Sequence, residues 1–387
     1  MTQIRLSLAP LEDCAALEGE WRALEQRADI DFYMSWGWIG TLLRRSGLTP
    51  FVVRAHDGAR LIGLGLVFTN RQRRHRWLGV RKLYLNETGD LDIDILFIEH
   101  NGFLCDSAYG AALPARCIDY VLSSDEARAL LGRWDEWRFG GVGEEYKTLL
   151  AATGLHTHVY SARAGGVVEL DALRARGETY LSTLSSNTRY QIRRALKLYG
   201  ERGPLTVTPA ITEADFARHF EGLKSLHQSY WLARGQKGAF GYPFLHDFHR
   251  EVLLRHGPLG EVELLRIAAG DFEIGYLYNF TFGGKVGAYL SGFAYEDDAK
   301  LKPGLVSHYL AIEHHLAGAA HVYDLLAGDM QYKRSLAMHS PQLYWLDLQR
   351  PRLKLRLEDV ARGLKHRFQA ARTPDAKTAP EGAVDAG

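Results

Sequence analysis

The residues best suited to chemistry lie between positions 285 and 336. Hydrophobic spacing in this stretch predicts a strand, a helix and a second strand, and the helix is preceded by Lys302-Pro303-Gly304. The first N–H groups of a helix have no internal partners and lie at the positive end of its dipole, so this helix entrance suits a phosphate group. An ordinary strand–helix–strand crossover explains the same pattern equally well.

The elements before this stretch predict how it is held in a sheet. Apolar alternation with a period of two predicts strands over 262–268, 274–282 and 286–295, separated by Gly-Asp and Gly-Gly turns. These three strands form an antiparallel meander. A helix follows from about residue 306, and the next strand covers 321–326.

A cationic ridge is predicted on an earlier helix, over residues 186–200. Arg189, Arg193 and Lys197 recur every four residues and therefore lie on one helix face. Cations without interleaved acids repel one another, which favours contact with an anion. A solvated helix face remains an equal alternative.

The chain is long enough for two domains, and the glycine pair Gly165-Gly166 marks the predicted boundary. We expect an N-terminal α/β unit over 1–165 and a second unit over 166–350. Residues 351–372 predict a basic amphipathic helix, which either packs on the domain or docks on an acidic partner or membrane surface. The Pro- and Ala-rich residues 373–387 predict a disordered tail.

Composition narrows the classes of function. The 47 basic and 46 acidic residues leave a formal charge of +1, so overall charge does not favour nucleic acid. No apolar run is long enough for a membrane span, and the first residues lack a signal-peptide core. The three cysteines are far apart in the sequence, which predicts reduced thiols in a cytoplasmic protein.

Three other stretches carry basic, glycine-rich or histidine-rich patterns. The basic run from Arg71 to Arg76 predicts an exposed loop, with phosphate contact as the alternative. The glycine-rich residues 234–241 form either a ligand cover or a plain connection. His308, His314 and His315 lack the spacing and carboxylate partner of a metal site, and no GxSxG nucleophile motif is present.

Four features in order resemble the GNAT acyltransferase fold, and more specifically the bacterial CelD-type acetyltransferase domain, which is related to Fem-type aminoacyltransferases. They are Ser186-x-x-Arg189-x-x-Ile192-Arg193-Arg194, Pro303-Gly304-Leu305, Val322-Tyr323-Asp324-Leu325-Leu326-x-Gly328 and Tyr332-Lys333. They extend from about residue 179 to 336. The first 165 residues resemble the degenerate first GNAT-like half of such proteins.

The resemblance implies an α/β (α+β) fold, a tandem GNAT-like arrangement of mixed, mostly antiparallel sheets flanked by helices. In this fold two parallel strands splay apart and acyl-CoA enters between them. Here the splay would separate 286–295 from 321–326, and acetyl-CoA or another acyl-CoA would be the co-substrate, with no metal. The implied cofactor-binding residues are Lys302, Pro303, Gly304, Leu305, Ser307 and His308.

Two of these assignments carry an alternative. The usual GNAT phosphate loop, Q/R-x-x-G-x-G/A, is not reproduced, because Leu301 and Val306 stand at two of its marked positions. Helix N–H groups with Lys300 or Lys302 would then serve the phosphates. His308 either faces the donor or is a solvated or capped helix histidine.

The resemblance also implies catalytic roles near the last strand. Tyr332 is the expected general acid, or else a structural or substrate-positioning tyrosine, and Lys333 is expected to bind an anionic group. Asp324 and Asp329 are candidates for the base or for orienting the amine; turn capping is the alternative for Asp329. The expected substrate-binding residues are Arg189, Arg193, Asn279 and Asp324.

The expected function is N-acyl transfer from acyl-CoA to a primary amine of a small molecule or amino sugar, by direct attack in a ternary complex. One alternative is Fem-type aminoacyl transfer from tRNA to a cell-wall precursor. Another is a non-catalytic GNAT-fold protein that assists exopolysaccharide synthesis. The acceptor pocket is predicted at the domain interface, between residues 32–38 and 99–103. The sequence indicates neither the acceptor nor an oligomeric state.

Overall fold

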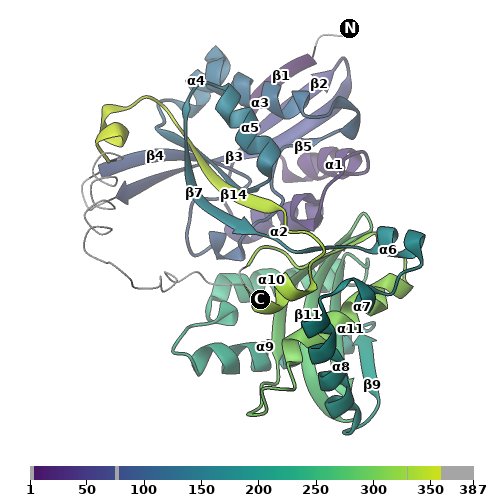
Figure 1. Cartoon of the computed structure of the whole chain (residues 1–387). Coiled ribbons are helices and arrows are strands. Elements are labelled where there is room, and N and C mark those ends of the chain that lie inside the picture. Colours follow the sequence, from purple (N-terminus) through teal and green to yellow (C-terminus); the bar gives the residue numbers. More distant parts are fainter. Residues whose placement is uncertain (1–3, 75–77, 329, 359–387) are drawn as a thin grey trace.

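The computed structural model describes residues 4–74, 78–328 and 330–358. It contains two sheets, one above the other in Figure 1, each flanked by helices. In spatial order the strands of the eight-stranded first sheet are β1 (Ile4–Pro10), β2 (Phe51–Asp57), β3 (Arg60–Arg74), β4 (Leu78–Leu85), β6 (Glu136–Val142), β14 (Gln342–Gln349) and β7 (His156–Ala164), with β5 (Leu104–Cys105) paired to β3. Those of the six-stranded second sheet are β8 (Val167–Glu169), β13 (Val322–Asp324), β12 (Lys285–Phe293), β11 (Phe272–Phe282), β10 (Val262–Ala269) and β9 (Leu205–Pro209).

The helices divide between the two sheets. Those of the N-terminal unit are α1 (Cys14–Glu25), α2 (Trp36–Ser46), α3 (Ala112–Ser123), α4 (Asp125–Leu131) and α5 (Glu144–Ala152), with short 3-10 turns at Phe32–Met34, Asp94–Leu96 and Ser107–Tyr109. Those of the C-terminal unit are α6 (Leu170–Arg176), α7 (Tyr180–Thr183), α8 (Ser186–Gly200), α9 (Glu213–Leu232), α10 (Pro243–His256), α11 (Pro303–Ala317) and α12 (Gln331–Leu336), with a 3-10 turn at Ala239–Gly241.

The two sheets repeat one pattern. Each has four consecutive antiparallel strands followed by one short parallel pair. The parallel pair is β4 with β6 in the first sheet and β12 with β13 in the second, and each pair is joined over only three residues per strand. The prediction of a tandem arrangement of mixed, mostly antiparallel sheets flanked by helices is confirmed.

One strand differs from the predicted domain boundaries. Residues 342–349 were assigned to the second unit, but β14 lies between β6 and β7 of the first sheet. The chain therefore leaves the first sheet after β7, builds the second, and returns. Sequence periodicity identifies a strand but does not identify its partner, which explains the difference.

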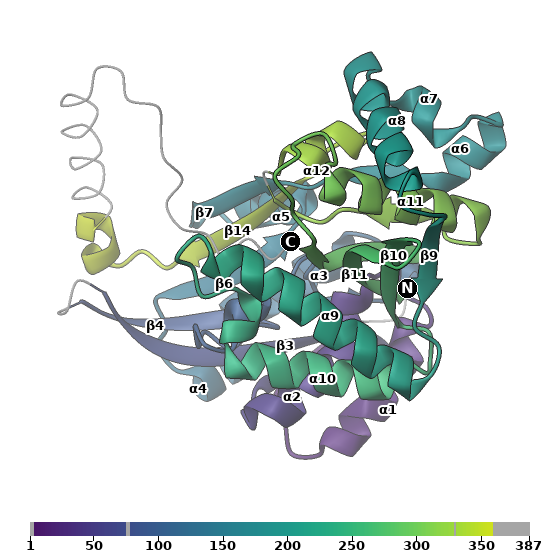
Figure 2. The same cartoon turned by 90° about the horizontal axis from the view of Figure 1, so that it is seen from below.

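The units share a hydrophobic core. Trp38 of α2 packs edge-on against Phe248 of α10 and Phe280 of β11, with ring centroids 4.9 and 5.7 Å apart. Two ion pairs join α2 to α10, Arg44 with Glu251 and Arg45 with Asp247, both at 2.8 Å. Figure 2 shows α10 lying beside α2.

The C-terminal segment is only partly described. A helix begins at residue 353 and is described to 358, and Leu355 is buried against Leu78 and Val80 of β4. The rest of the predicted 351–372 helix, and the whole predicted tail at 373–387, lie outside the described residues.

Candidate functional site

The site is organised by the divergence of β12 from β13. The two strands pair only from Lys285 to Gly287, although β12 continues to Phe293. The chain turns away after Asp324, whose Oδ1 accepts the Leu326 N–H at 2.6 Å. Leu326 has a φ of +59°, a left-handed conformation that is costly for leucine. The splay that the resemblance implied is therefore present at the expected strands.

Tyr332 and His308 lie together beside this opening. Their rings stack with centroids 4.9 Å apart and an interplanar angle of 14°, and Phe293 at the end of β12 is edge-on to both. His308 lies in the second turn of α11, and its Nδ1 is 3.3 Å from the Tyr323 hydroxyl. The structure thus brings the predicted acid into contact with a predicted cofactor-binding residue.

His308 is neutral. Burial lowers its pKa to about 3, and the nearby charge of Lys333 acts in the same direction. The ring therefore offers one N–H donor and one acceptor nitrogen rather than a positive charge.

Two buried polar atoms at this point of α11 lack partners among the described residues. They are His308 Nε2 and the hydroxyl of the adjacent Ser307, and both residues are fully or almost fully buried. Buried polar groups in native proteins are nearly always hydrogen-bonded to protein, water or ligand. Such a pair fits a polar ligand between α11 and the splayed strands.

The N-terminus of α11 is closely packed. Pro303, Gly304 and Leu305 are buried, and a Cβ on Gly304 would lie 3.1 Å from the Phe293 ring. Lys302 precedes the helix with a φ of +50°, and its side chain is exposed. Lys302 is therefore the residue of this turn that is open to an anion.

A second polar cluster lies deeper on the same face of the sheet. Glu263 of β10 accepts hydrogen bonds from Asn279 Nδ2 at 2.9 Å and from His315 Nε2 at 3.0 Å. Burial would raise the pKa of Glu263, but the hydrogen bond and charge of His315 hold it below its usual range. Asn279, a predicted substrate-binding residue, therefore belongs to this cluster, and its Oδ1 is another buried atom without a partner in the described chain.

Asp324 lies on the face of the sheet opposite to α11. The preceding residue of β13 faces α11, and successive side chains of a strand point to opposite sides. Its Oδ2 accepts a hydrogen bond from Nε2 of His100, a residue of the N-terminal unit, at 2.9 Å. Burial alone would lower the pKa of His100, but the hydrogen bond and charge of Asp324, with Asp31 and Glu99, raise that pKa to about 10. His100 is thus an imidazolium at neutral pH.

Glu99 and Lys333 fix the backbone beyond Asp324. Glu99 Oε2 accepts the Ala327 N–H at 2.8 Å, and Lys333 Nζ donates to the Ala327 carbonyl at 3.0 Å. Burial raises the pKa of Glu99. Lys333 is itself buried, so its ammonium is held in the protein rather than extended into solvent.

The remaining predicted site residues lie elsewhere or cannot be placed. Arg189 donates to the carbonyls of Leu184 at 2.5 Å and Ser182 at 3.3 Å, so it secures the start of α8. Arg193 is exposed on the same helix. Asp329 lies outside the described residues.

Sequence reasoning missed part of the site. Glu263, His315 and Tyr323 had no assigned role, and no local pattern places Glu263 beside a histidine 52 residues away. Glu99 and His100 appeared only as part of a predicted acceptor pocket. Their direct contacts to residues 324–327 depend on the packing of two units that the sequence does not align.

Comparison with known proteins finds a family match in the C-terminal unit. Residues 186–334 match the family model described as an acetyltransferase (GNAT) domain. No curated protein sequence matches the chain. The match to a GNAT acetyltransferase domain therefore lies within the C-terminal unit of the 387-residue chain.

Solved structures share the fold over both units. FemX is 12% identical with a TM-score of 0.57, covering 91% of this chain and 99% of that chain. The C-terminal domain of a putative lysylphosphatidylglycerol synthetase from Agrobacterium fabrum is 11% identical with a TM-score of 0.53, covering 90% and 96%. L-PGS from Bacillus licheniformis is 10% identical with a TM-score of 0.52, covering 90% and 96%. At these identities the likeness shows a common fold.

Within the described ranges, no helix is long and apolar enough to cross a membrane.

Proposed function

We propose that this protein is an N-acyltransferase that moves an acyl group, acetyl in the simplest case, from acyl-CoA to a primary amine of a small molecule or amino sugar. The observation that carries this proposal is the splayed edge of β12. Buried polar atoms on its α11 face have no partner among the residues that the structure describes, and the Asp324–His100 pair lies on the other face. Donor and acceptor would enter from these two faces and meet at the opening.

The residues on the α11 face fit an acyl-pantetheine group. Ser307 and His308 offer buried polar atoms without partners in the described chain, and Phe293 and Tyr332 offer apolar ring surface. Lys302, whose side chain is exposed at the start of α11, would hold the phosphates. Acyl-CoA supplies an activated acyl group at this position.

His308 would position and polarise the acyl carbonyl. Burial raises the pKa of the Tyr323 phenol well above its ordinary value, so the phenol keeps its proton and would donate it to His308 Nδ1, 3.3 Å away. The proton of the neutral imidazole would then lie on Nε2, where it could be donated to the acyl oxygen. A preorganised donor in a water-poor site stabilises developing negative charge on oxygen.

Tyr332 would supply the proton that the leaving sulfur requires. Its ring is held by stacking on His308, and stacking fixes the direction of the phenol. Most of the remaining rate enhancement comes from holding amine and thioester in line.

Asp324 would orient the amine on the opposite face. The carboxylate is fixed by His100 and by the Leu326 N–H, so it presents a defined oxygen edge. Glu99, whose raised pKa favours proton uptake, is the second carboxyl group at this face and is the proposed proton acceptor. The N-terminal unit would thus contribute directly to the acceptor side.

The likeness to FemX across both units supports one second function, Fem-type transfer of an aminoacyl group from tRNA. The balanced charge of the chain does not favour it. The third function, a non-catalytic GNAT-fold protein, would leave the His308–Tyr332 pair without a role.

Thermal shift separates these functions. Acetyl-CoA, longer acyl-CoAs and free CoA at millimolar concentration should raise the melting temperature of the wild type, because a ligand that binds only the folded state stabilises it. His308→Ala should reduce this shift, and the exposed-surface variant His339→Ala should retain it. The absence of any shift would contradict the acyl-CoA proposal, and stabilisation by aminoacyl-tRNA alone would favour the Fem-type function.

A further inference from the structure

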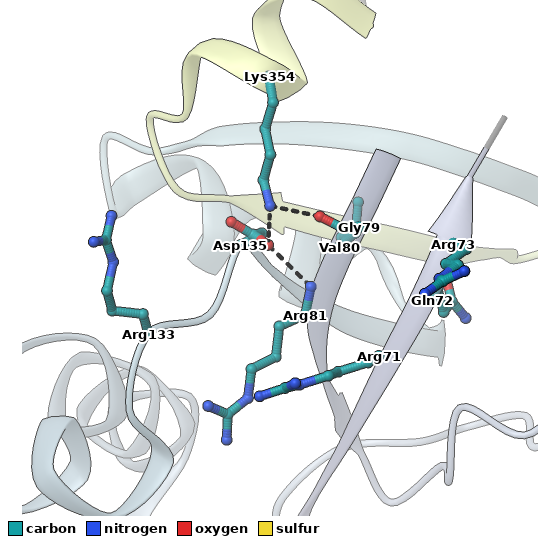
Figure 3. Close-up of a pocket in the computed structure, with 9 residues that line it drawn as sticks. All are labelled: Arg71, Gln72, Arg73, Gly79, Val80, Arg81, Arg133, Asp135 and Lys354. Carbon is teal, nitrogen blue, oxygen red and sulfur yellow. Dashed lines mark hydrogen bonds and ion pairs between the residues drawn. The ribbon is translucent and has the colours of Figure 1, made fainter. Parts of the chain in front are cut away.

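A basic pocket lies on the N-terminal unit, beside the β3–β4 hairpin and on the side remote from α8 and α11 in Figures 1 and 2. Its volume is about 680 Å³. The charged residues that line it are Arg71, Arg73, Arg81, Arg133, Asp135 and Lys354. Figure 3 shows the side chains of Arg71 and Arg81 extending side by side, with Arg133 coming from a separate loop.

The arginines are placed against one another. Arg71 of β3 and Arg81 of β4 are direct cross-strand partners, and Arg73 follows Arg71 on the same face. Like charges directly opposite on neighbouring strands destabilise a sheet. None of the guanidinium groups of Arg71, Arg73, Arg81 and Arg133 has an ion-pair or hydrogen-bond partner in the described part of the chain.

The single acid of the pocket does not compensate them. Asp135 Oδ2 accepts a hydrogen bond from Lys354 Nζ at 2.6 Å and from the Arg81 backbone N–H at 2.9 Å. Five cations and one carboxylate give the pocket lining a formal charge of +4, whereas the whole chain carries +1. The pocket is therefore a local concentration of charge and not a reflection of overall composition.

The neighbouring Arg74, in contrast, forms ion pairs within the protein. Its side chain points to the other face of β3, where it pairs with Glu136 at 2.5 Å and Glu358 at 3.1 Å. Carboxylates thus pair with the arginine on one face of β3. The arginines on the pocket face have no carboxylate partner in the described part of the chain and can bind an added anion.

We propose that this pocket binds a small molecule through a diphosphate or triphosphate group. Guanidinium groups match phosphate oxygens in planar, bidentate geometry, and several of them require more than one phosphate. The volume lies in the range of small-molecule sites. None of the described side chains that line the pocket is aromatic, so the described lining offers no surface for stacking the bases of single-stranded nucleic acids.

The test uses the full chain and inorganic probes. Pyrophosphate and tripolyphosphate should bind in calorimetric titration and raise the melting temperature, whereas sulfate at equal ionic strength should not. Arg71→Gln/Arg81→Gln should weaken binding at least tenfold and, without ligand, melt at a higher temperature because the cross-strand repulsion is gone. Arg133→Gln alone should weaken binding severalfold. The control Arg176→Gln/Arg218→Gln, which changes two surface arginines paired to Glu178 and Asp215, should bind as the wild type does.

Three outcomes would overturn the proposal. They are equal responses to sulfate and pyrophosphate, equal losses in the pocket and control variants, and tighter binding of RNA or of anionic phospholipid vesicles than of tripolyphosphate. CoA also carries a diphosphate, so binding of CoA to the basic pocket must be distinguished from binding at α11. The acetyl-CoA thermal shift should persist in Arg71→Gln/Arg81→Gln. A negative result at one site therefore does not contradict the proposal for the other site.

Discussion

Two histidines on opposite faces of the splay have opposite charge states. His308 is neutral because burial and Lys333 both disfavour its proton, whereas His100 is charged because Asp324 outweighs the cost of burial. The sequence predicted His308 as a site residue from its place one turn inside a helix. It did not predict the His100–Asp324 pair, since 224 residues separate the two and no local pattern encodes such a contact.

Tyr332→Phe tests the proposed acid. The variant keeps the ring that stacks on His308, so the acyl-CoA thermal shift should be unchanged, while turnover should fall by about 10²-fold, the scale of general acid catalysis. Steady-state rates would be compared with Tyr190→Phe, a change at an exposed tyrosine of α8. Unchanged turnover would remove Tyr332 as the acid.

His100→Gln tests the charge of the interface pair by its pH dependence. The folded-state pKa of about 10 lies above the unfolded value near ~6.5, so the stabilisation is complete below the unfolded value and is lost as pH rises to about 10. Between pH 6 and pH 10 the wild type should lose about 4 kcal/mol more unfolding free energy than the variant, which is the value that linkage gives for these two pKa values. Urea denaturation across this range measures the difference. Parallel curves for wild type and His100→Gln, with His339→Gln as surface control, would show that the pair is not charged.

At the scale of elements, the site depends on how α9 and α11 hold the two faces of β12. The sequence predicted the meander, the helix at Pro303 and the following strand, because their periodicity and turn residues are strong local signals. The length of the β12–β13 pairing and the close approach of α9 are not local properties. The close approach of α9 depends on Gly292, whose missing side chain lets the α9 backbone reach the strand.

Gly292→Ala should therefore disrupt this packing. A Cβ at Gly292 would lie 2.5 Å from the Leu223 carbonyl oxygen and 3.0 Å from the His227 nitrogen, and backbone atoms cannot rotate away. We expect a loss of about 2 kcal/mol in the free energy of unfolding, typical of overpacking. Gly287→Ala on the same strand is the matched control, since its nearest neighbour is a Leu326 methyl at 3.5 Å. Equal denaturation midpoints for the two variants would contradict this packing account.

At the scale of the whole molecule, we expect the two units to unfold as one cooperative body. The sequence indicated two GNAT-like halves, but residues 342–349, predicted in the second unit, form a strand of the first sheet. Strands β7 and β14 pair although 177 residues separate the end of β7 from the start of β14. Such pairing is set by the tertiary fold, and the periodicity of the sequence does not indicate it. The return of the chain through β14 and the shared core around Trp38 tie the stability of each unit to the other.

Trp38→Ala tests this coupling. Trp38 is buried among residues of both units, and its removal should cost about 4 kcal/mol through the cavity that remains. Differential scanning calorimetry should show one transition in the wild type and one transition at lower temperature in the variant. Two separate transitions, with only the first affected, would show that the units unfold independently.

Acyl transfer at the splayed edge of β12 is tested most directly by amine-dependent release of CoA from acetyl-CoA, followed by mass spectrometry. The wild type, incubated with a panel of small primary amines and amino sugars, should release CoA and form the matching N-acetyl product with at least one of them. His308→Ala should lower both yields together, and Tyr190→Phe should leave them unchanged. No acyl-CoA binding and no amine-dependent CoA release across acetyl and longer acyl donors would contradict the account.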